Sequence, residues 1–348
     1  MTYMKKIIYL ITLSVLLFAG CSKHPVSPKV PEQFDRYIFF SQQVQTKAEL
    51  IKSGDAMGQF GIVGFKYDNS TSWENIKASA TPNVFFDDAG NDVKVETCIV
   101  DGSNASYSPL QGWSNSKKYS FFAYYPMNNV TLVNLNGSSY IRGVPAIKYE
   151  MSGTDLKGSM VDLMVATPHT NLDGSSSDVT SNDVTFSFNH CLSSLGVNIQ
   201  NASAGSIEIA GVSLALSNIK YSTVIVPLDG TAETPSGSLP DQSCDLSLAD
   251  AEKSIASGTT DHELSDKLIL IPQNDENLSV GLTIYYKRTY SNGTVMDGQT
   301  FTTSTPLTTK LTKGKKYTIH LKFTDSNTYA MVESGNWETG PNVNHEFN

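Results

Sequence analysis

Short runs in which apolar and polar residues alternate recur along the chain, and they restrict the fold more than any other feature. In Tyr317–Phe323, the residues Tyr317, Ile319, Leu321 and Phe323 would all face the same side. Successive side chains of a strand point to opposite faces, so this alternation predicts antiparallel strands with one buried and one solvated face. Other runs of strand character are Tyr37–Val44, Phe60–Tyr67, Val93–Val100, Tyr119–Tyr125, Val184–Phe188, Leu195–Ile199 and Val280–Tyr286.

These runs predict an all-β protein built of stacked antiparallel sheets. The best candidate for a short helix is Ala249–Ile255. Aromatic residues make up 10% of the 348 residues, which argues against disorder. The formal net charge is −9, and this excludes a nucleic-acid-binding protein that works through a basic surface.

A polar, turn-rich stretch at residues 168–182 has no hydrophobic period and predicts a domain boundary. It separates an N-terminal domain, 34–168, from a C-terminal domain, 182–348. Each piece has a length that suits one β-sandwich. We therefore expect two tandem antiparallel sandwich domains.

The first twenty residues, 1–20, predict a secretion signal. Lys5 and Lys6 precede the apolar run Ile7–Phe18, which is too short to span a bilayer. The small pair before Cys21 resembles the end of a bacterial lipoprotein signal, in which the cysteine becomes the lipidated N-terminus. An ordinary signal peptide with a chance cysteine is the alternative. Residues 21–33 contain three prolines and predict a tether.

The sequence predicts no catalytic, cofactor or metal site, and the chain is expected not to be an enzyme. The histidines lack the spacing of a zinc protease, and His190 is expected to be structural and hydrogen-bonded. The acidic loop Asp87–Asp92 could hold Ca²⁺, but a plain hairpin loop fits its spacing better. Cys98 and Cys191 are expected to be buried thiols.

Two further sets of residues leave alternatives open. With Cys21 acylated, three cysteines remain, so at most one disulfide can form; they are Cys98, Cys191 and Cys244. The three tryptophans could stack on sugar rings or could be ordinary core residues; they are Trp73, Trp113 and Trp337.

The order of the motifs over residues 34–340 resembles the fimbrillin family of Bacteroidales bacteria, the fimbrial subunits and their Mfa-like relatives. The most specific match is Trp113 followed by Lys118–Pro126 (KYSFFAYYP). Further matches are Thr46–Ala48, Phe60–Tyr67 with Trp73, Asp162–Ala166, Val184–Ile199, Leu270–Gln273, Gly314–Phe323 and Trp337.

This resemblance implies two transthyretin-like sandwich domains, lipoprotein export to the outer membrane and assembly into a surface fimbria that supports adhesion. The implied partners are other fimbrial subunits of the same family, the membrane through the lipid on Cys21, and a host or glycan ligand. It also implies that an Arg/Lys-directed protease removes the first strand, Tyr37–Gln45, so that a neighbouring subunit can donate a strand. The matching cleavage position is Lys47, and Arg36 is the fallback.

The alternative function is a tip or surface glycan-binding adhesin lipoprotein that does not polymerise. A shaft subunit needs a C-terminal strand to donate, and residues 325–348 are interrupted by Gly335, Gly340 and Pro341. This segment could instead be the last strand of the second domain. Shaft, tip and anchor positions in the fimbria all stay open.

Overall fold

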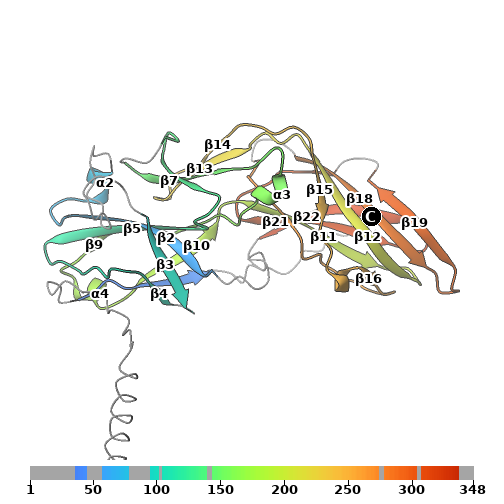
Figure 1. Cartoon of the computed structure of the whole chain (residues 1–348), viewed down its shortest axis with the longest axis horizontal. Coiled ribbons are helices and arrows are strands. Elements are labelled where there is room, and N and C mark those ends of the chain that lie inside the picture. The colour runs from blue at the N-terminus through green and yellow to red at the C-terminus, as the bar shows by residue number, and fades with distance from the viewer. Residues whose placement is uncertain are drawn as a thin grey trace, which may run out of the picture.

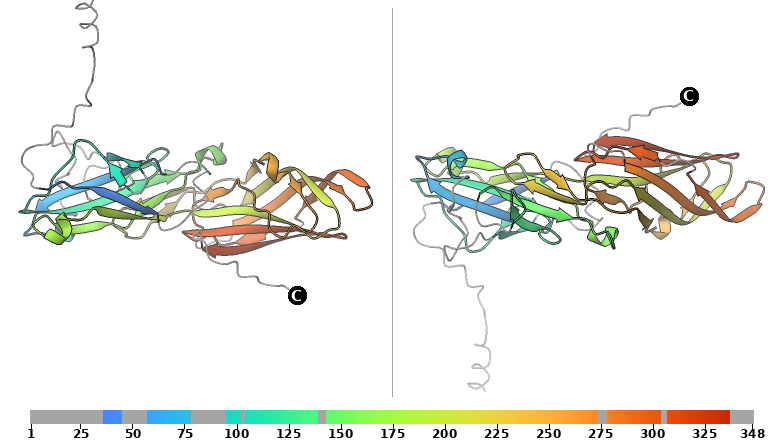
Figure 2. Two further views of the ribbon diagram at one scale, coloured as in Figure 1. Left: turned by 90° about the horizontal axis from the view of Figure 1, so that it is seen from below. Right: turned by 90° about the horizontal axis from the view of Figure 1, so that it is seen from above.

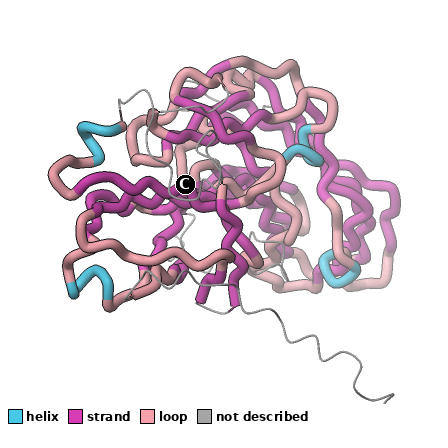
Figure 3. Tube along the Cα trace, turned by 60° about the vertical axis from the view of Figure 1, so that its left-hand side comes forward, coloured by secondary structure: helices cyan, strands magenta, loops and turns pink. Residues whose placement is uncertain are grey.

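The molecule consists of two groups of β-sheets that lie end to end along its long axis (Figure 1). The computed structural model describes residues 36–44, 57–77, 95–101, 104–138, 143–273, 278–303 and 307–336. Strands dominate these residues, and the α-helices among them have four residues each (Figure 3): Trp73–Ile76 (α2), Leu156–Ser159 (α3) and Ser177–Thr180 (α4). The all-β prediction is therefore confirmed. No helix in the described ranges is long and apolar enough to cross a membrane.

The first group is built around a closed ring of strands. In ring order the strands are Gln59–Asp68 (β2), Glu96–Asp101 (β3), Asn104–Ser106 (β4), Phe40–Val44 (β1), Val184–His190 (β10), Met164–Ala166 (β8) and Lys117–Tyr125 (β5). Each strand pairs with the next, and β5 pairs with β2, which closes the ring. His169–Asp173 (β9) lies beside β8 on the same edge of β5. A ring of paired strands is a barrel and has no free edge among its members.

Alternate side chains of the ring fill the barrel. Phe60 of β2, Phe121 of β5 and Phe186 and Phe188 of β10 are buried in one apolar cluster. The ring of Phe60 packs edge to face against those of Phe186 and Phe188, with 5.3 Å between the centroids of Phe60 and Phe188. The alternation seen in the sequence places these residues inside because neighbouring side chains of a strand point to opposite faces.

The outer face of β2 and β5 is also apolar, and a second sheet shares its core. That sheet consists of Thr131–Asn134 (β6), Pro145–Glu150 (β7), Thr223–Pro227 (β13) and Thr234–Ser236 (β14). Val63 and Phe65 of β2 belong to the same buried cluster as Ile147 of β7 and Val224 of β13. The first group is thus a barrel backed by a sheet, whereas the sequence predicted a plain two-sheet sandwich.

The second group has two sheets that share one core, and Figure 2 shows it edge-on. One sheet consists of Leu268–Leu270 (β17), Ser193–Asn201 (β11), Lys315–Phe323 (β21) and Thr328–Asn336 (β22). The other consists of Gln242–Leu246 (β15), Ser206–Ser217 (β12), Leu278–Thr289 (β18) and Val295–Thr302 (β19), with Ser254–Ile255 (β16) and Leu307–Thr309 (β20) paired to it. The transthyretin-like class of either group stays a prediction.

The chain passes from the first group of sheets to the second at a different place from the predicted domain boundary. Residues 168–182, expected to link two domains, include β9 and α4, and β9 pairs with β5 of the barrel. β10 follows and is also a barrel strand, so the second group of sheets begins at β11. The chain later returns to the first group, because β13 pairs with β7. Residues 168–182 thus include a strand of the barrel, and the domain bounds stay a prediction.

The helix predicted at Ala249–Ile255 is wrong. This segment forms a single 3₁₀ turn, Asp250–Glu252 (η1), followed by the short strand β16. The carbonyl of Lys253 accepts a hydrogen bond from the backbone N–H of Ile209 in β12, at 2.7 Å. The carbonyl of Lys253 is thus hydrogen-bonded to the sheet, whereas in a longer helix it would accept a hydrogen bond from within the helix.

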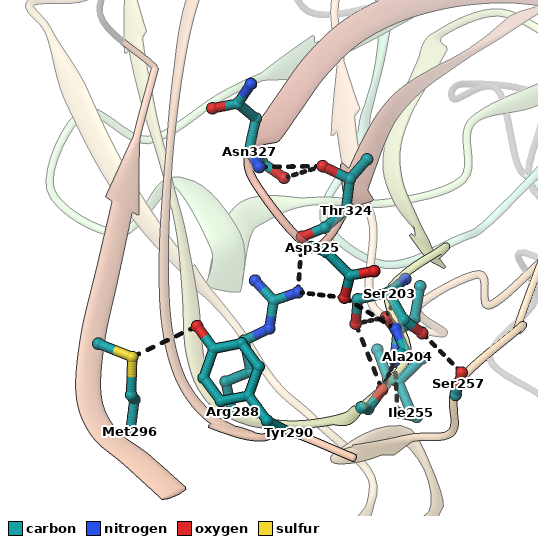
Figure 4. A network of polar contacts seen from close by, with 12 residues as sticks. Ser203, Ala204, Ile255, Ser257, Arg288, Tyr290, Met296, Thr324, Asp325 and Asn327 are labelled. Carbon is teal, nitrogen blue, oxygen red and sulfur yellow. Dashed lines mark hydrogen bonds and ion pairs between the residues drawn. The ribbon is translucent and has the colours of Figure 1, made fainter. Parts of the chain in front are cut away.

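Three turns meet at the far end of the second group, where Arg288 joins them (Figure 4). Its guanidinium donates a hydrogen bond to the carbonyl of Thr324 at 2.6 Å and lies 3.5 Å from the carboxylate of Asp325. Asp325 also accepts a hydrogen bond from the backbone N–H of Ala204 at 3.0 Å, and the Arg288 side chain covers the ring of Tyr290 at 4.8 Å. This network fixes the ends of β11, β18 and β21 relative to one another.

Candidate functional site: the enclosed first strand

The first strand, β1, occupies a slot in the barrel between β4 and β10. Its five residues lie in register with β10 and run parallel to it, from Phe40 opposite Val184 to Val44 opposite Phe188. On its other edge β1 pairs antiparallel with β4. A strand paired on both edges is part of the sheet interior, so β1 closes the barrel.

The residues just before β1 are also fastened to the barrel. The backbone N–H of Trp113 donates to the carbonyl of Arg36 at 3.0 Å, and Tyr37 forms a β-bridge with Gly112. The backbone N–H of Ile38 donates to the carbonyl of Gln111 at 2.9 Å. Within the described residues, the pairing of the N-terminal segment thus extends upstream of β1 as far as Arg36.

Side chains of this segment alternate between the barrel interior and the surface. Ile38 is 0% exposed and Phe40 is 1% exposed, whereas Phe39 between them is 48% exposed. The ring of Phe40 lies 5.1 to 5.6 Å from three aromatic rings of the interior, those of Tyr107, Phe121 and Phe186. Two apolar side chains at alternate positions thus anchor the strand in the slot.

The phenols and the thiol near the slot are uncharged near pH 7. The Tyr107 hydroxyl donates a hydrogen bond to the carbonyl of Ile38 at 3.0 Å, and burial raises the pKa of this phenol. Burial raises the pKa of the Cys98 thiol, and the nearby Glu96 carboxylate raises it further. Burial also raises the pKa of Tyr119 to about 12. A neutral thiol and neutral phenols suit packing and give no acid or base for catalysis near pH 7.

The predicted processing residues are placed only in part. Arg36 lies in the described segment, whereas Lys47 and the lipidation residue Cys21 lie outside the described residues. Lys47 follows the end of β1 at Val44 in the connection to β2. The sequence identified the first strand but not its neighbours, because nothing local in residues 37–45 points to β10.

We expect trypsin to leave the Arg36–Tyr37 bond intact in the folded protein and to cut it in the denatured chain. A protease needs an extended backbone that is free of other pairing, and here the Arg36 carbonyl is hydrogen-bonded and Tyr37 is bridged. Limited proteolysis followed by fragment masses would measure this. Equal cutting rates at Arg36 with and without urea would contradict the prediction.

No catalytic constellation emerges from the residues that the sequence singled out. His190 is buried, and its Nδ1 lies 2.7 Å from Oδ1 of Asp162, so it is a hydrogen-bonded structural residue as expected. Cys191 beside it is buried, which raises the pKa of its thiol to about 12 and keeps it protonated. Cys98, Cys191 and Cys244 are all buried and form no disulfide.

Metal and glycan sites gain no support from the described part of the chain. It contains no group of three or more His, Cys, Asp or Glu side chains that could hold a metal ion, and the loop Asp87–Asp92 lies outside it. Trp73 and Trp113 are 2% and 5% exposed, so they are core residues there, whereas Trp337 lies outside the described residues. The large exposed aromatic residues of the described ranges lie just before β1, in β18 and in β22, and belong to no common sheet: Phe39, Tyr285 and Tyr329.

The segment Thr328–Asn336 was expected either to be part of a donated strand or to be part of the last strand of the second domain. It forms β22 and pairs with β21 along its whole length, from Phe323 opposite Thr328 to Lys315 opposite Asn336. These residues are therefore the last described strand of the second group. Residues 337–348 lie outside the described residues.

Together, the fold and the site define an all-β protein whose distinctive feature is a first strand enclosed on both edges. The chain belongs to the fimbrillin-like family, whose profile matches residues 55–337. The family prediction made from the motif order is thereby confirmed.

Comparison with solved structures concerns the fold alone. A fimbrial protein from Bacteroides vulgatus superposes with a TM-score of 0.60 at 20% identity, over 87% of this chain and 100% of that chain. The tip fimbrial protein Mfa3 from Porphyromonas gingivalis, with a C-terminal truncation, gives a TM-score of 0.38 at 9% identity, over 86% of this chain and 100% of that chain. Of these two, the first indicates a shared fold. No curated protein sequence matches this chain significantly.

Proposed function

We propose that this chain is a fimbrial subunit that is exported as a lipoprotein to the outer membrane and assembled at the cell surface by strand exchange. In this proposal Cys21 carries the lipid, and proteolysis after Lys47 separates β1 from the rest of the chain. A strand of a neighbouring subunit then occupies the slot between β4 and β10. The assembled fimbria supports adhesion.

The observation that carries the proposal is the enclosure of β1. It pairs with β10 and β4 on its two edges and inserts Ile38 and Phe40 into the barrel, yet it lies near the N-terminus and is followed by a single connection to β2. Another extended strand can supply the same backbone hydrogen bonds and the same two side chains, which is the β-augmentation mode of binding. Such contacts between copies are heterologous and do not close, so they generate a filament.

We expect subunits sheared from the cell surface to begin at Ala48. N-terminal sequencing or intact mass would measure this, and Lys47→Gln should block the processing. Lys52→Gln is the matched control, because it removes a second lysine of the same connection and should leave processing unchanged. Surface material that begins at Cys21 or Ser22 would refute the proposed processing.

A further inference from the structure

Two large apolar side chains lie exposed on one cross-strand row of the outer barrel surface. Phe39 is 48% exposed, and Ile99 of β3, at 60%, has the largest exposed fraction of the large apolar side chains in the described ranges. Ile99 lies opposite Ser106 of β4, and continuing the register of β1 and β4 by one residue places Phe39 on the other side of Ser106. Residues directly opposite each other point to the same face of a sheet, so the two apolar side chains share this face.

Tyr37 extends this surface along the N-terminal segment. Its ring lies 6.5 Å from that of Phe39, edge to face. Both side chains point outward, because Ile38 and Phe40 at the alternate positions are buried. We call Tyr37, Phe39 and Ile99 the apolar row. None of the three belongs to either of the two buried clusters of the described residues.

The charges beside the apolar row restrict the kind of surface that it fits. Asp101, at the end of β3, and Asp183, just before β10, are both exposed. Carboxylates repel an anionic surface, so attraction between opposite charges does not bring this face to a membrane of acidic lipids. An uncharged apolar surface suits it better, because removing exposed apolar side chains from water is favourable.

The proposed lipid anchor is close to the apolar row in the sequence. Arg36, the first described residue, comes 15 positions after Cys21. A chain of that length spans at most about 50 Å, so a lipid on Cys21 keeps the start of the barrel near the bilayer. A contact that is too weak to bind a membrane alone becomes effective at the high local concentration that such a link imposes.

We propose that the apolar row is a membrane-contact surface. In the lipid-anchored subunit, Tyr37, Phe39 and Ile99 lie against the interface of a neutral lipid bilayer, where aromatic rings are favourably placed. The barrel then rests on the membrane with the face formed by β1, β4 and β3. The exposed residues Tyr285 of β18 and Val295 of β19, in the second group, stay in water. This inference rests on the lipid anchor of the proposed function.

The test couples a phospholipid to the thiol of Cys21 in the chain from Cys21 onward. The other three cysteines of the chain are buried, so a thiol reagent selects Cys21 in the folded protein: Cys98, Cys191 and Cys244. The coupled protein is placed in phosphatidylcholine vesicles whose acyl chains carry bromine, which quenches tryptophan fluorescence on contact. Vesicles of the same lipid without bromine give the reference emission.

A tryptophan on the apolar row reports the contact. The emission that Phe39→Trp adds to that of the parent protein should be at least about twofold lower in the brominated vesicles. Tyr285→Trp is the matched control, because Tyr285 is an aromatic residue of the second group with 50% exposure, and its added emission should be the same in both kinds of vesicle. Unquenched emission from Phe39→Trp, or equal quenching of both variants, would overturn the proposal.

A second substitution tests whether the row acts as one surface. Ile99→Ser in the Phe39→Trp variant should lower the quenching at least about twofold, whereas Val295→Ser, which removes a 54% exposed side chain from β19, should leave it unchanged. Both positions are exposed, so neither change should unfold the protein. Equal effects of the two substitutions would overturn the proposal. So would emission that varies with protein concentration and not with bromine, since a second copy would then cover the row.

Failure of the contact and failure of the proposed function give different results. Chemical coupling supplies the lipid here, so the quenching does not depend on natural lipidation. The intact mass of the protein purified from membranes measures natural lipidation separately. Natural protein without a lipid would refute the proposed export, whereas an unquenched Phe39→Trp variant would refute the contact surface.

Discussion

Replacing Phe40 by alanine is expected to lower the free energy of unfolding by about 3–5 kcal/mol. Phe40 is 1% exposed, and its ring packs against those of Tyr107, Phe121 and Phe186. Because β1 is held on both edges, the surrounding strands cannot simply collapse into the space that the ring leaves. The truncation therefore costs the transfer free energy of the ring and the energy of a cavity.

Chemical denaturation would measure this change. Trp113 lies in the same buried cluster, with its ring 6.3 Å from that of Phe121, so its fluorescence reports on the barrel. Phe39→Ala is the matched control, since it removes the same ring from the neighbouring, outward-facing position and should change stability by less than about 0.5 kcal/mol. Equal effects of the two substitutions would contradict the enclosed position of β1.

The strands and their inner faces could be predicted from the sequence because alternation is a local signal. The run Val184–Phe188 was predicted to be a strand, and its alternate residues Phe186 and Phe188 both lie inside the barrel. The buried state of Cys98 and Cys191 was predicted on similar grounds and is confirmed. Local patterns carry this information because side-chain direction depends only on position along the strand.

The closure of the barrel could not be predicted in this way. β1 and β10 are neighbours although Ser41 and Thr185 are 144 residues apart in sequence. The apolar alternation of β10 predicted a strand, but the same pattern fits a strand of either domain. This strand was assigned to the second domain, because it follows the polar stretch 168–182. The Lys47 connection was identified from the family motif, whereas the enclosure of the strand before it depends on pairing between distant segments.

The prediction of a short helix at Ala249–Ile255 was wrong for a related reason. In this segment the backbone carbonyl of Glu252 lies 2.9 Å from Nε2 of His262, and one of its carboxylate oxygens accepts a hydrogen bond from the N–H of Ala249. The carbonyls of Glu252 and Lys253 thus contact His262 and Ile209 outside the segment and are not used by a helix. Helix propensity is a weak preference that tertiary contacts override.

Gly205→Ala is expected to destabilise the second group of sheets by about 3 kcal/mol. Gly205 lies in the turn just before β12, beside the network of Ala204, Asp325 and Arg288 in Figure 4. A Cβ at this position would lie 2.0 Å from the carbonyl oxygen of Thr289 and 2.9 Å from its carbonyl carbon. These are backbone atoms of a paired strand, so they cannot move away without breaking the register of β12 and β18.

Gly211→Ala, inside β12, is the matched control. A Cβ there would meet Cδ2 of Tyr285 at 3.5 Å, which is an ordinary contact, so this variant should be neutral or more stable by up to about 1 kcal/mol. Denaturation midpoints of both variants, compared with that of the parent protein, would measure the two changes in stability. Equal stability of the Gly205 and Gly211 variants would show that the turn before β12 can open to admit a methyl group. In that case the Arg288 network would not hold the far end of the molecule in one arrangement.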